Sequence, residues 1–438
     1  MDLNLYKLRR DEKMKKLSLA ALFLAALMLV GCVTHMSYTK TPDDAVDTCA
    51  LWRAEIWAEH VARETNVQRR ILEMRGNTMA FGGVSMRYVY FVIGEPGENG
   101  FPLFIAMHGG GGVPAATNDS QWVAMQTYYQ FSVPYGIYVA VRGVRDTWNT
   151  HFNDESFPLY DRLIENMILF RNVDPNRVYL MGYSAGGDGV YGIAPRMADR
   201  FAAVHMSAGH HNWVNPINLM NTPITLQMGE NDTAFNRHLE TARFGQSLAA
   251  LANAHPGRYM HTVLMHQGRG HAIVDNDMGR TLQTVFADSE AWLMYREGET
   301  DETPETVQIN ANAVDFLTPH TRDPLPTELA WDLSTRANRR SVESFFWLRA
   351  GFDVGGGTIF ASYDRASNAI TVDTLDINGE FYVLLNSLMV DFSQPVTIIV
   401  DGAATTHNLT PDEDIVRLTT RERGDPNFQF SAMVRIAQ

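Results

Sequence analysis

A serine that could act as a nucleophile lies in the pentapeptide Gly182-Tyr183-Ser184-Ala185-Gly186. The pattern G-x-S-x-G is typical of a sharp turn between a strand and a helix, where the serine is exposed and small neighbours let other backbone pass close by. An apolar run, Val178–Met181, precedes the motif, and a helical pattern follows it. Because the motif occurs in this context, it indicates a nucleophilic serine rather than a glycine-rich structural turn.

The run His108-Gly109-Gly110-Gly111-Gly112 follows a second apolar segment, Leu103–Met107. Acyl transfer places negative charge on a carbonyl oxygen, and backbone N–H groups must point at that oxygen to stabilise it. The expected donors are the amides of Ala185, Gly109 and Gly110. A phosphate-binding loop is the alternative, but the following G-K-[ST] and the acidic residue of a dinucleotide fingerprint are missing.

A serine hydroxyl becomes a good nucleophile when a base takes its proton and a carboxylate orients that base. The sequence Gly229-Glu230-Asn231-Asp232 follows the apolar run Ile224–Met228 and supplies a carboxylate. If that run is a parallel strand, the carboxylate lies at the sheet edge that also presents Ser184. Asp232 is favoured over Glu230 as the acid because it lies later in the loop.

The candidate base follows the next apolar run, Tyr259–Met265, in the sequence Gly268-Arg269-Gly270-His271. The order serine, acid, histidine along the chain is the one expected for a serine on this type of turn. His266 is the nearest alternative, but it falls at the end of the predicted strand. The sequence therefore favours His271, which lies in the loop beyond.

Aromatic and imidazole side chains follow two other predicted strands at the same edge. Trp148 and His151 come after the run Ile137–Val141, and His211 and Trp213 come after Ala202–Met206. These four residues could line a substrate pocket and stack on a sugar or a phenolic acyl group. They could equally pack the loops, and the sequence leaves both interpretations open.

Short apolar runs alternate with longer helical patterns across the first three quarters of the chain, after an amphipathic pattern over Asp44–Arg75 and a hairpin over Thr78–Ile93. Apolar strands separated by helices predict an α/β fold with a mostly parallel central sheet and helices on both faces. Helices are expected near Ser120–Phe131, Tyr160–Arg171, Gly186–Met197, Arg237–Ala254 and Thr281–Arg296.

The pattern changes around residues 297–325, and only strand-like runs follow, among them Glu328–Leu333, Thr358–Tyr363 and Val416–Thr420. Clusters of Gly, Asn, Asp and Pro separate these runs, which is typical of an all-β sandwich. We therefore predict an α/β catalytic domain over residues 44–322 and a β-sandwich domain over residues 323–438. The aromatic sequence Phe345-Phe346-Trp347 is expected in the core of the sandwich.

The first residues indicate export. Lys15 and Lys16 precede an apolar run, Leu17–Val30, that is too short to span a bilayer and leads to Cys32. This pattern resembles a bacterial lipoprotein signal and predicts a signal peptide over residues 1–32, lipidation at Cys32, a tether over 33–43, and a lipid anchor holding the protein in the bacterial cell envelope. An uncleaved anchor, or a disulfide between Cys32 and Cys49, is the alternative.

Composition excludes several classes of protein. Of the 438 residues, 45% are hydrophobic and 20% are charged, which excludes wholesale disorder and a polytopic membrane protein. A net charge of -14 argues against nucleic acid as a partner. Two cysteines do not suffice for a disulfide scaffold or a thiolate metal site, and no metal is expected. The oligomeric state is not indicated.

Taken together, His108–Gly112, Gly182–Gly186, Asp232 and His271 resemble the esterase branch of the α/β-hydrolase superfamily. The segment Val178–Gly187 with its downstream acid and histidine is similar to the esterase/poly(3-hydroxyalkanoate) depolymerase and feruloyl-esterase group. The resemblance covers roughly residues 77–296. It implies hydrolysis of a small-molecule or polymeric ester, glycan-linked esters included, through a serine acyl-enzyme and without a cofactor. The many cysteines of secreted fungal feruloyl esterases are absent, and the C-terminal β region has no counterpart in the minimal fold.

The sequence therefore predicts an exported serine esterase, with Ser184 as nucleophile, His271 as base and Asp232 as orienting acid. A peptidase of the prolyl-oligopeptidase type is one alternative, although its β domain precedes the hydrolase part and the β region here follows it. A surface lipoprotein that binds glycan without catalysis is the other alternative.

Overall fold

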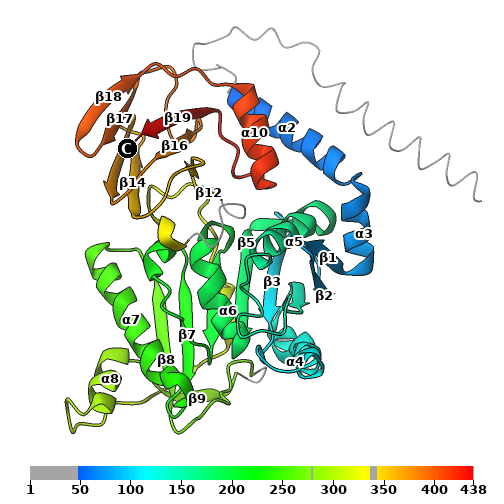
Figure 1. Ribbon diagram of the computed structural model, residues 1–438, viewed down its shortest axis with the longest axis vertical. Coiled ribbons are helices and arrows are strands. Elements are labelled where there is room, and N and C mark those ends of the chain that lie inside the picture. Colours follow the sequence, from blue (N-terminus) through cyan, green and yellow to red (C-terminus); the bar gives the residue numbers. More distant parts are fainter. Residues whose placement is uncertain (1–47, 278–279, 336–342, 438) are drawn as a thin grey trace, which may run out of the picture. The chain divides into compact units, whose positions relative to one another are not determined.

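The computed structural model describes residues 48–277, 280–335 and 343–437 (Figure 1). The predicted signal peptide, Cys32 and the tether lie outside these ranges. Residues Cys49–Gln438 form one compact unit, and the boundary predicted between residues 322 and 323 stays a prediction. No helix in the described ranges combines the length and apolar character needed to cross a bilayer. Cys49 is buried and forms no disulfide with another described residue, and the alternative of its pairing with Cys32 stays a prediction.

Within the described residues, the central sheet has ten strands in the order β1-β2-β4-β3-β5-β6-β7-β8-β9-β10. Strands β3 to β8 are parallel, whereas β1, β2, β9 and β10 are antiparallel to their neighbours, so the predicted mostly parallel sheet is confirmed. The strands are Thr78–Phe81 (β1), Val84–Ile93 (β2), Phe101–Met107 (β3), Gly136–Val141 (β4), Val173–Tyr183 (β5), Ala203–Ser207 (β6), Ile224–Gly229 (β7), His261–His266 (β8), Leu282–Phe286 (β9) and Val307–Asn310 (β10).

Helices pack on both faces of this sheet because its central strands bury alternate side chains on each side. In β3, Leu103 and Ile105 join a core shared with α5, α6 and α7, while Phe104 and Ala106 join a second core shared with α4 and α9. The helices are Thr48–Glu64 (α2), Gln68–Gly76 (α3), Ala115–Tyr128 (α4), Ser156–Arg171 (α5), Ala185–Ile193 (α6), Arg237–Ala254 (α7), Ser289–Glu297 (α8) and Ala313–Leu317 (α9). Short 3₁₀ turns are Gln130–Ser132 (η1), Ala194–Arg196 (η2), Ala198–Arg200 (η3), Pro216–Leu219 (η4), Ala234–Asn236 (η5) and Leu333–Thr335 (η6).

The C-terminal region contains a five-stranded sheet, β11-β14-β15-β17-β18, and a four-stranded sheet, β12-β13-β16-β19, among the described residues. The ring of Trp331 in β11 stacks on Phe345 in β12 at 5.6 Å, so side chains from the two sheets share a core. Phe345, Phe346 and Trp347 are all buried, as predicted. The strands are Glu328–Asp332 (β11), Ser344–Phe345 (β12), Leu348–Ala350 (β13), Thr358–Asp364 (β14), Ala369–Leu375 (β15), Glu380–Leu385 (β16), Val396–Val400 (β17), Ala403–His407 (β18) and Ala432–Ala437 (β19).

Two predicted elements are wrong. The expected helix Thr281–Arg296 is strand β9 followed by helix α8, because Asp288 caps α8 by accepting the N–H groups of Glu290 and Ala291. The expected strand Val416–Thr420 belongs to helix α10, Glu413–Arg423, capped by Asp412 at its start and by Gly424 in the left-handed conformation at its end. The amphipathic pattern over residues 44–75 also forms two helices, α2 and α3, rather than one.

Candidate active site

Ser184 lies at a strained turn between β5 and α6, with φ 58° and ψ −119°. The residues two positions before and after it, Gly182 and Gly186, have to be glycine because other backbone passes very close to them. A Cβ at Gly182 would lie 2.2 Å from the carbonyl oxygen of Gly186, and a Cβ at Gly186 would lie 2.1 Å from that of Met107. The G-x-S-x-G pattern therefore produces the expected strand-to-helix turn, with the serine at its tip.

The three residues favoured as nucleophile, base and acid lie in one hydrogen-bonded row. The hydroxyl of Ser184 is 2.9 Å from Nε2 of His271, and Nδ1 of His271 is 2.6 Å from Oδ2 of Asp232. Asp232 follows β7 and has a side chain only 2% exposed, whereas the imidazole of His271, after β8, is 44% exposed. An imidazole that donates from Nδ1 to the carboxylate leaves Nε2 free to accept the serine proton.

Glu230 and His266 lie elsewhere in the network. Oε2 of Glu230 accepts the backbone N–H of Gly268 at 2.7 Å, so this carboxylate holds the loop on which His271 lies. His266 is buried and donates from Nε2 to Gln227 at 2.9 Å, and burial lowers its pKa to about 4. Neither alternative is part of the row that contains Ser184.

The glycine run lies beside the serine. A Cβ at Gly109 would be 3.3 Å from Cβ of Ser184, and the backbone hydrogen bonds of the described loops include none donated by Gly109 or Gly110. Asn118 holds the run in place, since its side chain accepts from the N–H of Gly111 and donates to the same residue's carbonyl, both at 2.9 Å. Ala185 is the first residue of α6, where a helix leaves backbone N–H groups without internal partners.

His151 packs against this glycine run and is not among the residues that line the cavity at Ser184, so it follows the loop-packing interpretation that the sequence left open. It is fully buried, donates from Nε2 to the carbonyl of His108 at 2.9 Å, and accepts from the hydroxyl of Tyr160 at 3.2 Å. His108 in turn donates to the carbonyl of Gly109 and accepts from the N–H of Gly143. Burial lowers the pKa of both imidazoles, that of His108 to about 4, so both are neutral supports of the loop.

A cavity of about 470 Å³ opens at Ser184, and we call it the serine cavity. Of the predicted pocket residues, Trp148 and Trp213 line it, and both rings are largely exposed. His211 does not line it: its Nε2 donates to Glu240 and its Nδ1 accepts the N–H of Trp213, so it holds the loop that presents that ring. The lining residues are Gly110, Gly112, Trp148, Ser184, Ala185, Asp188, His210, Asn212, Trp213, Phe235 and Arg237.

Asp188, Phe235 and Arg237 line the cavity although sequence reasoning did not select them. Asp188 accepts the N–H of His210 at 2.7 Å, and burial raises its pKa to about 6. Its position one helical turn after Ser184, in the first turn of α6, is the signal in the sequence that could have found it. The guanidinium of Arg237 lies 4.8 Å above the ring of Phe235, and nothing in the sequence marks that pair.

A buried polar cluster fixes the loop that contains His271. Asp275, in that loop, accepts from Nε2 of His205 and from the hydroxyl of Tyr129 at 2.8 Å each, and from Tyr128 at 2.9 Å. Burial alone would raise the pKa of Asp275, but hydrogen bonds from these partners hold it below its ordinary value. Tyr183, next to the nucleophile, also donates to the carbonyl of His271. The loop that carries the imidazole is thus held both by the buried cluster around Asp275 and by the hydroxyl of Tyr183.

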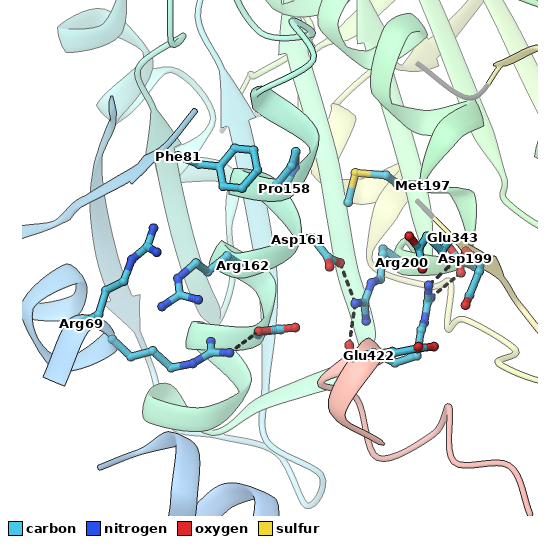
Figure 2. Close-up of a pocket in the computed structure, with 14 residues that line it drawn as sticks. Arg69, Phe81, Pro158, Asp161, Arg162, Met197, Asp199, Arg200, Glu343 and Glu422 are labelled. Carbon is cyan, nitrogen blue, oxygen red and sulfur yellow. Dashed lines mark hydrogen bonds and ion pairs between the residues drawn. The ribbon is translucent and has the colours of Figure 1, made fainter. Parts of the chain in front are cut away.

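A second cavity, of about 450 Å³, lies away from the serine and is lined mainly by charged side chains (Figure 2). Its arginines face carboxylates directly: Arg70 meets Glu165 at 2.6 Å, Arg200 meets Asp161 at 2.6 Å, and Arg423 pairs with Asp199. We call it the arginine cavity. Its lining residues are Arg69, Arg70, Phe81, Pro158, Asp161, Arg162, Glu165, Met197, Asp199, Arg200, Glu343, Ser344, Glu422 and Arg423. No group of His, Cys, Asp and Glu suited to a metal ion occurs within the described ranges.

The parallel sheet, the serine turn after β5 and the order serine, acid, histidine at the carboxyl ends of successive strands form a known arrangement. The chain has the α/β-hydrolase fold. The adjoining sheets β11–β19 are additional to it.

No protein-family model and no curated protein matches this chain. Among solved structures it is similar to a thermostable esterase, with 21% identity and a TM-score of 0.36 over 56% of this chain, and the match spans 62% of the esterase. An acetyl xylan esterase from Aspergillus awamori has 13% identity and a TM-score of 0.32, with 45% of this chain and 94% of the esterase covered. An acylaminoacyl peptidase from Pyrococcus horikoshii has 15% identity and a TM-score of 0.30, with 44% and 36% covered. An activity for this chain therefore has to follow from the geometry of its own site.

Proposed function

We propose that the chain is a serine hydrolase that cleaves carboxylic esters through an acyl-enzyme on Ser184. The observation that carries this proposal is the hydrogen-bonded row Ser184–His271–Asp232, with distances of 2.9 and 2.6 Å. A serine joined to an imidazole, which is itself oriented by a buried carboxylate, is the arrangement that activates a hydroxyl for attack on a carbonyl. The row opens into a cavity large enough for a small acyl group and its alcohol.

In the first half of the reaction, Oγ of Ser184 forms a bond to the ester carbonyl carbon while Nε2 of His271 takes the hydroxyl proton. The carbonyl oxygen becomes negatively charged, and the amides of Ala185, Gly110 and Gly109 are the donors we propose for it. When the tetrahedral intermediate collapses, the bond to the alcohol oxygen breaks. His271 then protonates the departing alcohol, and the acyl group stays on Ser184.

In the second half, water replaces the alcohol. His271 takes a proton from the water, the resulting hydroxide adds to the acyl carbon, and Ser184 leaves with the proton that His271 returns. The products are the free acid and the regenerated serine. Asp232, almost completely buried, keeps Nδ1 of His271 as a donor and stabilises the imidazolium that forms in each half.

The decisive variant is Ser184→Ala, which removes the nucleophile and leaves the rest of the site unchanged. We expect it to lower kcat on 4-nitrophenyl esters by at least about a thousandfold and to abolish labelling by a fluorophosphonate. The matched control is Ser120→Ala, at an exposed serine on α4. Labelling that persists in Ser184→Ala would refute the assignment.

Parallel assays compare aryl esters with aminoacyl anilides. We expect the esters to be cleaved with the higher kcat/KM. A preference for the anilides would favour the peptidase alternative. Wild-type protein that binds a glycan but neither reacts with the fluorophosphonate nor cleaves any of these compounds would favour the non-catalytic alternative.

A further inference from the structure

Two loops present aromatic rings to the serine cavity at a conformational cost. Trp213 and Phe235 are 86% and 77% exposed, and both have positive φ angles, 59° and 57°. Each ring has an asparagine beside it that is also in this region, Asn212 at 51° and Asn236 at 56°. Residues with side chains adopt this conformation at a cost of about 1–3 kcal/mol each, and such strain concentrates at ligand sites. Exposed rings held at a cost indicate contact with a ligand that fills the cavity.

Arg237 lines the same cavity with hydrogen-bonding capacity to spare. Its side chain is 16% exposed, and its Nη1 donates to the carbonyl of Ala234 at a long 3.3 Å. The same nitrogen is 3.8 Å from Oδ1 of Asp232, and Nε is buried without a hydrogen-bond partner. In the arginine cavity the carboxylates of Glu165 and Asp161 lie 2.6 Å from their arginines, closer than the 3.8 Å between Arg237 and Asp232.

A guanidinium in this state has a clear chemical preference. It is planar and always charged, and it can give two parallel hydrogen bonds to a carboxylate. The ring of Phe235 lies against one face of the Arg237 guanidinium, at 4.8 Å, and helps to orient the N–H groups that would donate to a carboxylate. The other polar side chains lining the cavity are less suited to bind an anion: Asp188 repels one, and His210 and Asn212 already hydrogen-bond to each other.

Resting on the proposed function, we propose that the preferred substrate is an ester that carries a carboxylate, and that Arg237 is the residue that selects it. The carboxylate pairs with the guanidinium while the apolar part of the substrate contacts Trp148, Trp213 and Phe235. The ester carbonyl then lies at Ser184, which lines the same cavity. Asp188 disfavours an anion on its own side of the cavity, so the charge of the substrate has to be directed toward Arg237.

A supporting role toward Asp232 is the competing explanation for Arg237, because the two side chains are 3.8 Å apart. The two roles differ in what they do to selectivity. A residue that only supports Asp232 affects every ester alike, since the row Ser184–His271–Asp232 acts on all of them. A residue that binds the substrate carboxylate changes the ratio of kcat/KM between an anionic ester and its neutral counterpart.

The experiment measures that ratio in two matched pairs. One pair is the 4-nitrophenyl monoester of adipic acid and 4-nitrophenyl hexanoate, in which the charge is on the acyl side. The other is 4-carboxyphenyl acetate and phenyl acetate, in which it is on the alcohol side. We expect the wild-type protein to prefer the anionic member of at least one pair. Arg237→Gln should lower that ratio by about ten- to a hundredfold, the usual worth of a hydrogen bond to a charged group.

Arg237→Lys keeps the charge but cannot give two parallel hydrogen bonds to a carboxylate. Its ratio of kcat/KM between the anionic and the neutral ester should therefore lie between those of Arg237→Gln and the wild type. The control is Arg243→Gln on the same helix, because Arg243 pairs with Glu240 and Glu297 outside the cavity. Added salt should weaken the preference of the wild-type protein. Preference for the neutral ester in both pairs, or an equal loss on both members in Arg237→Gln, would overturn the inference. Failure of the proposed function looks different: no ester is cleaved in a manner that depends on Ser184.

Discussion

The serine cavity and the arginine cavity have nearly the same volume, about 470 and about 450 Å³, but they use their polar groups differently. In the arginine cavity, cations and carboxylates meet each other at hydrogen-bond distance (Figure 2). In the serine cavity, Nη1 of Arg237 is 3.8 Å from Oδ1 of Asp232, and Asp188 accepts a backbone N–H rather than an arginine. Volume therefore does not distinguish a site from a structural crevice. The distance between an arginine and its carboxylate does, 2.6 Å in the arginine cavity and 3.8 Å for Arg237 in the serine cavity.

The charges of the arginine cavity have a structural task. They connect segments that are far apart in the sequence: Arg200 and Asp161 come from the hydrolase part, and Arg423 ends helix α10. In the sequence Arg423-Gly424-Asp425, Gly424 adopts the left-handed conformation and ends α10. The two charges flanking Gly424 are buried, and Asp425 meets Arg322 at 2.9 Å. Such pairs give little net stability, but removal of one partner leaves an uncompensated buried charge.

The largest effect that separates the two cavities is expected for Asp232→Asn. The amide no longer holds Nδ1 of His271 as a donor, so Nε2 is not kept ready to accept the serine proton. We expect kcat on a 4-nitrophenyl ester to fall by about a thousand- to ten-thousandfold. Thermal unfolding provides the second measurement. The contribution of the arginine cavity to Tm should not change, because its ion pairs are intact in this variant.

Glu230→Gln is the matched control, since Glu230 lies two residues earlier and bonds the N–H of Gly268 instead of the imidazole. Its kcat should fall less than about tenfold, because a glutamine oxygen can still accept that N–H. Equal losses in the two variants would contradict the choice of acid and would leave the serine cavity without its defining row.

The contrast between the cavities also explains what the sequence could predict. The serine turn, the glycine run and the loops bearing Asp232 and His271 follow from local patterns, because each depends on a strand end and its neighbours. Helix α10 could have been read from Asp412 and Gly424 as caps, but the β-branched residues between them suggested a strand. Strand β9 depends on pairing with β8 and β10, which only the sheet reveals.

The roles of polar residues away from the motifs depend on tertiary burial and were not predictable. His151 precedes a helix like many surface histidines, yet its burial beneath the carbonyl of His108 makes it a support of the glycine run. Arg237 and Arg423 look alike in the sequence. Each lies over an aromatic ring, but Arg237 is 3.8 Å from Asp232 whereas Arg423 pairs directly with Asp199, because packing places their carboxylates differently.

The reciprocal change is Asp199→Asn in the arginine cavity. Asp199 is buried and accepts from Arg423 and from the N–H of Phe346, so the amide keeps the shape and leaves the guanidinium without its counter-charge. We expect unfolding to become easier by about 3–5 kcal/mol, seen as a lower Tm and urea midpoint. The kcat/KM of the folded protein on neutral esters should stay within about threefold of the wild-type value.

Glu343→Gln is the control within the same cavity, because Glu343 is exposed and lies 3.7 Å from Arg349. Its effect on stability should be within about 0.5 kcal/mol. An Asp199→Asn protein as stable as the wild type would show that the buried charges do not hold the arginine cavity together.

The smallest effect concerns Asp188 and depends on pH. Burial raises its pKa from 3.8 in the unfolded chain to about 6 in the folded protein, so the folded state binds the proton more tightly. Above pH 6 the ionised carboxyl opposes folding in full, by up to about 3 kcal/mol. As the pH falls below 6, the folded carboxyl takes up its proton and the cost decreases, and it is lost only below the unfolded pKa of 3.8.

Asp188→Asn removes this cost and can still accept the N–H of His210, so it should unfold at a higher temperature than the wild type at pH 7.5. At pH 4.5 the gain should shrink to about a third of its value at pH 7.5, whereas the exposed control Asp301→Asn should match the wild type at both pH values. A gain that is the same at both pH values would mean that the carboxylate is not destabilised by the cavity. Burial in the serine cavity would then impose no cost on the ionised carboxyl of Asp188.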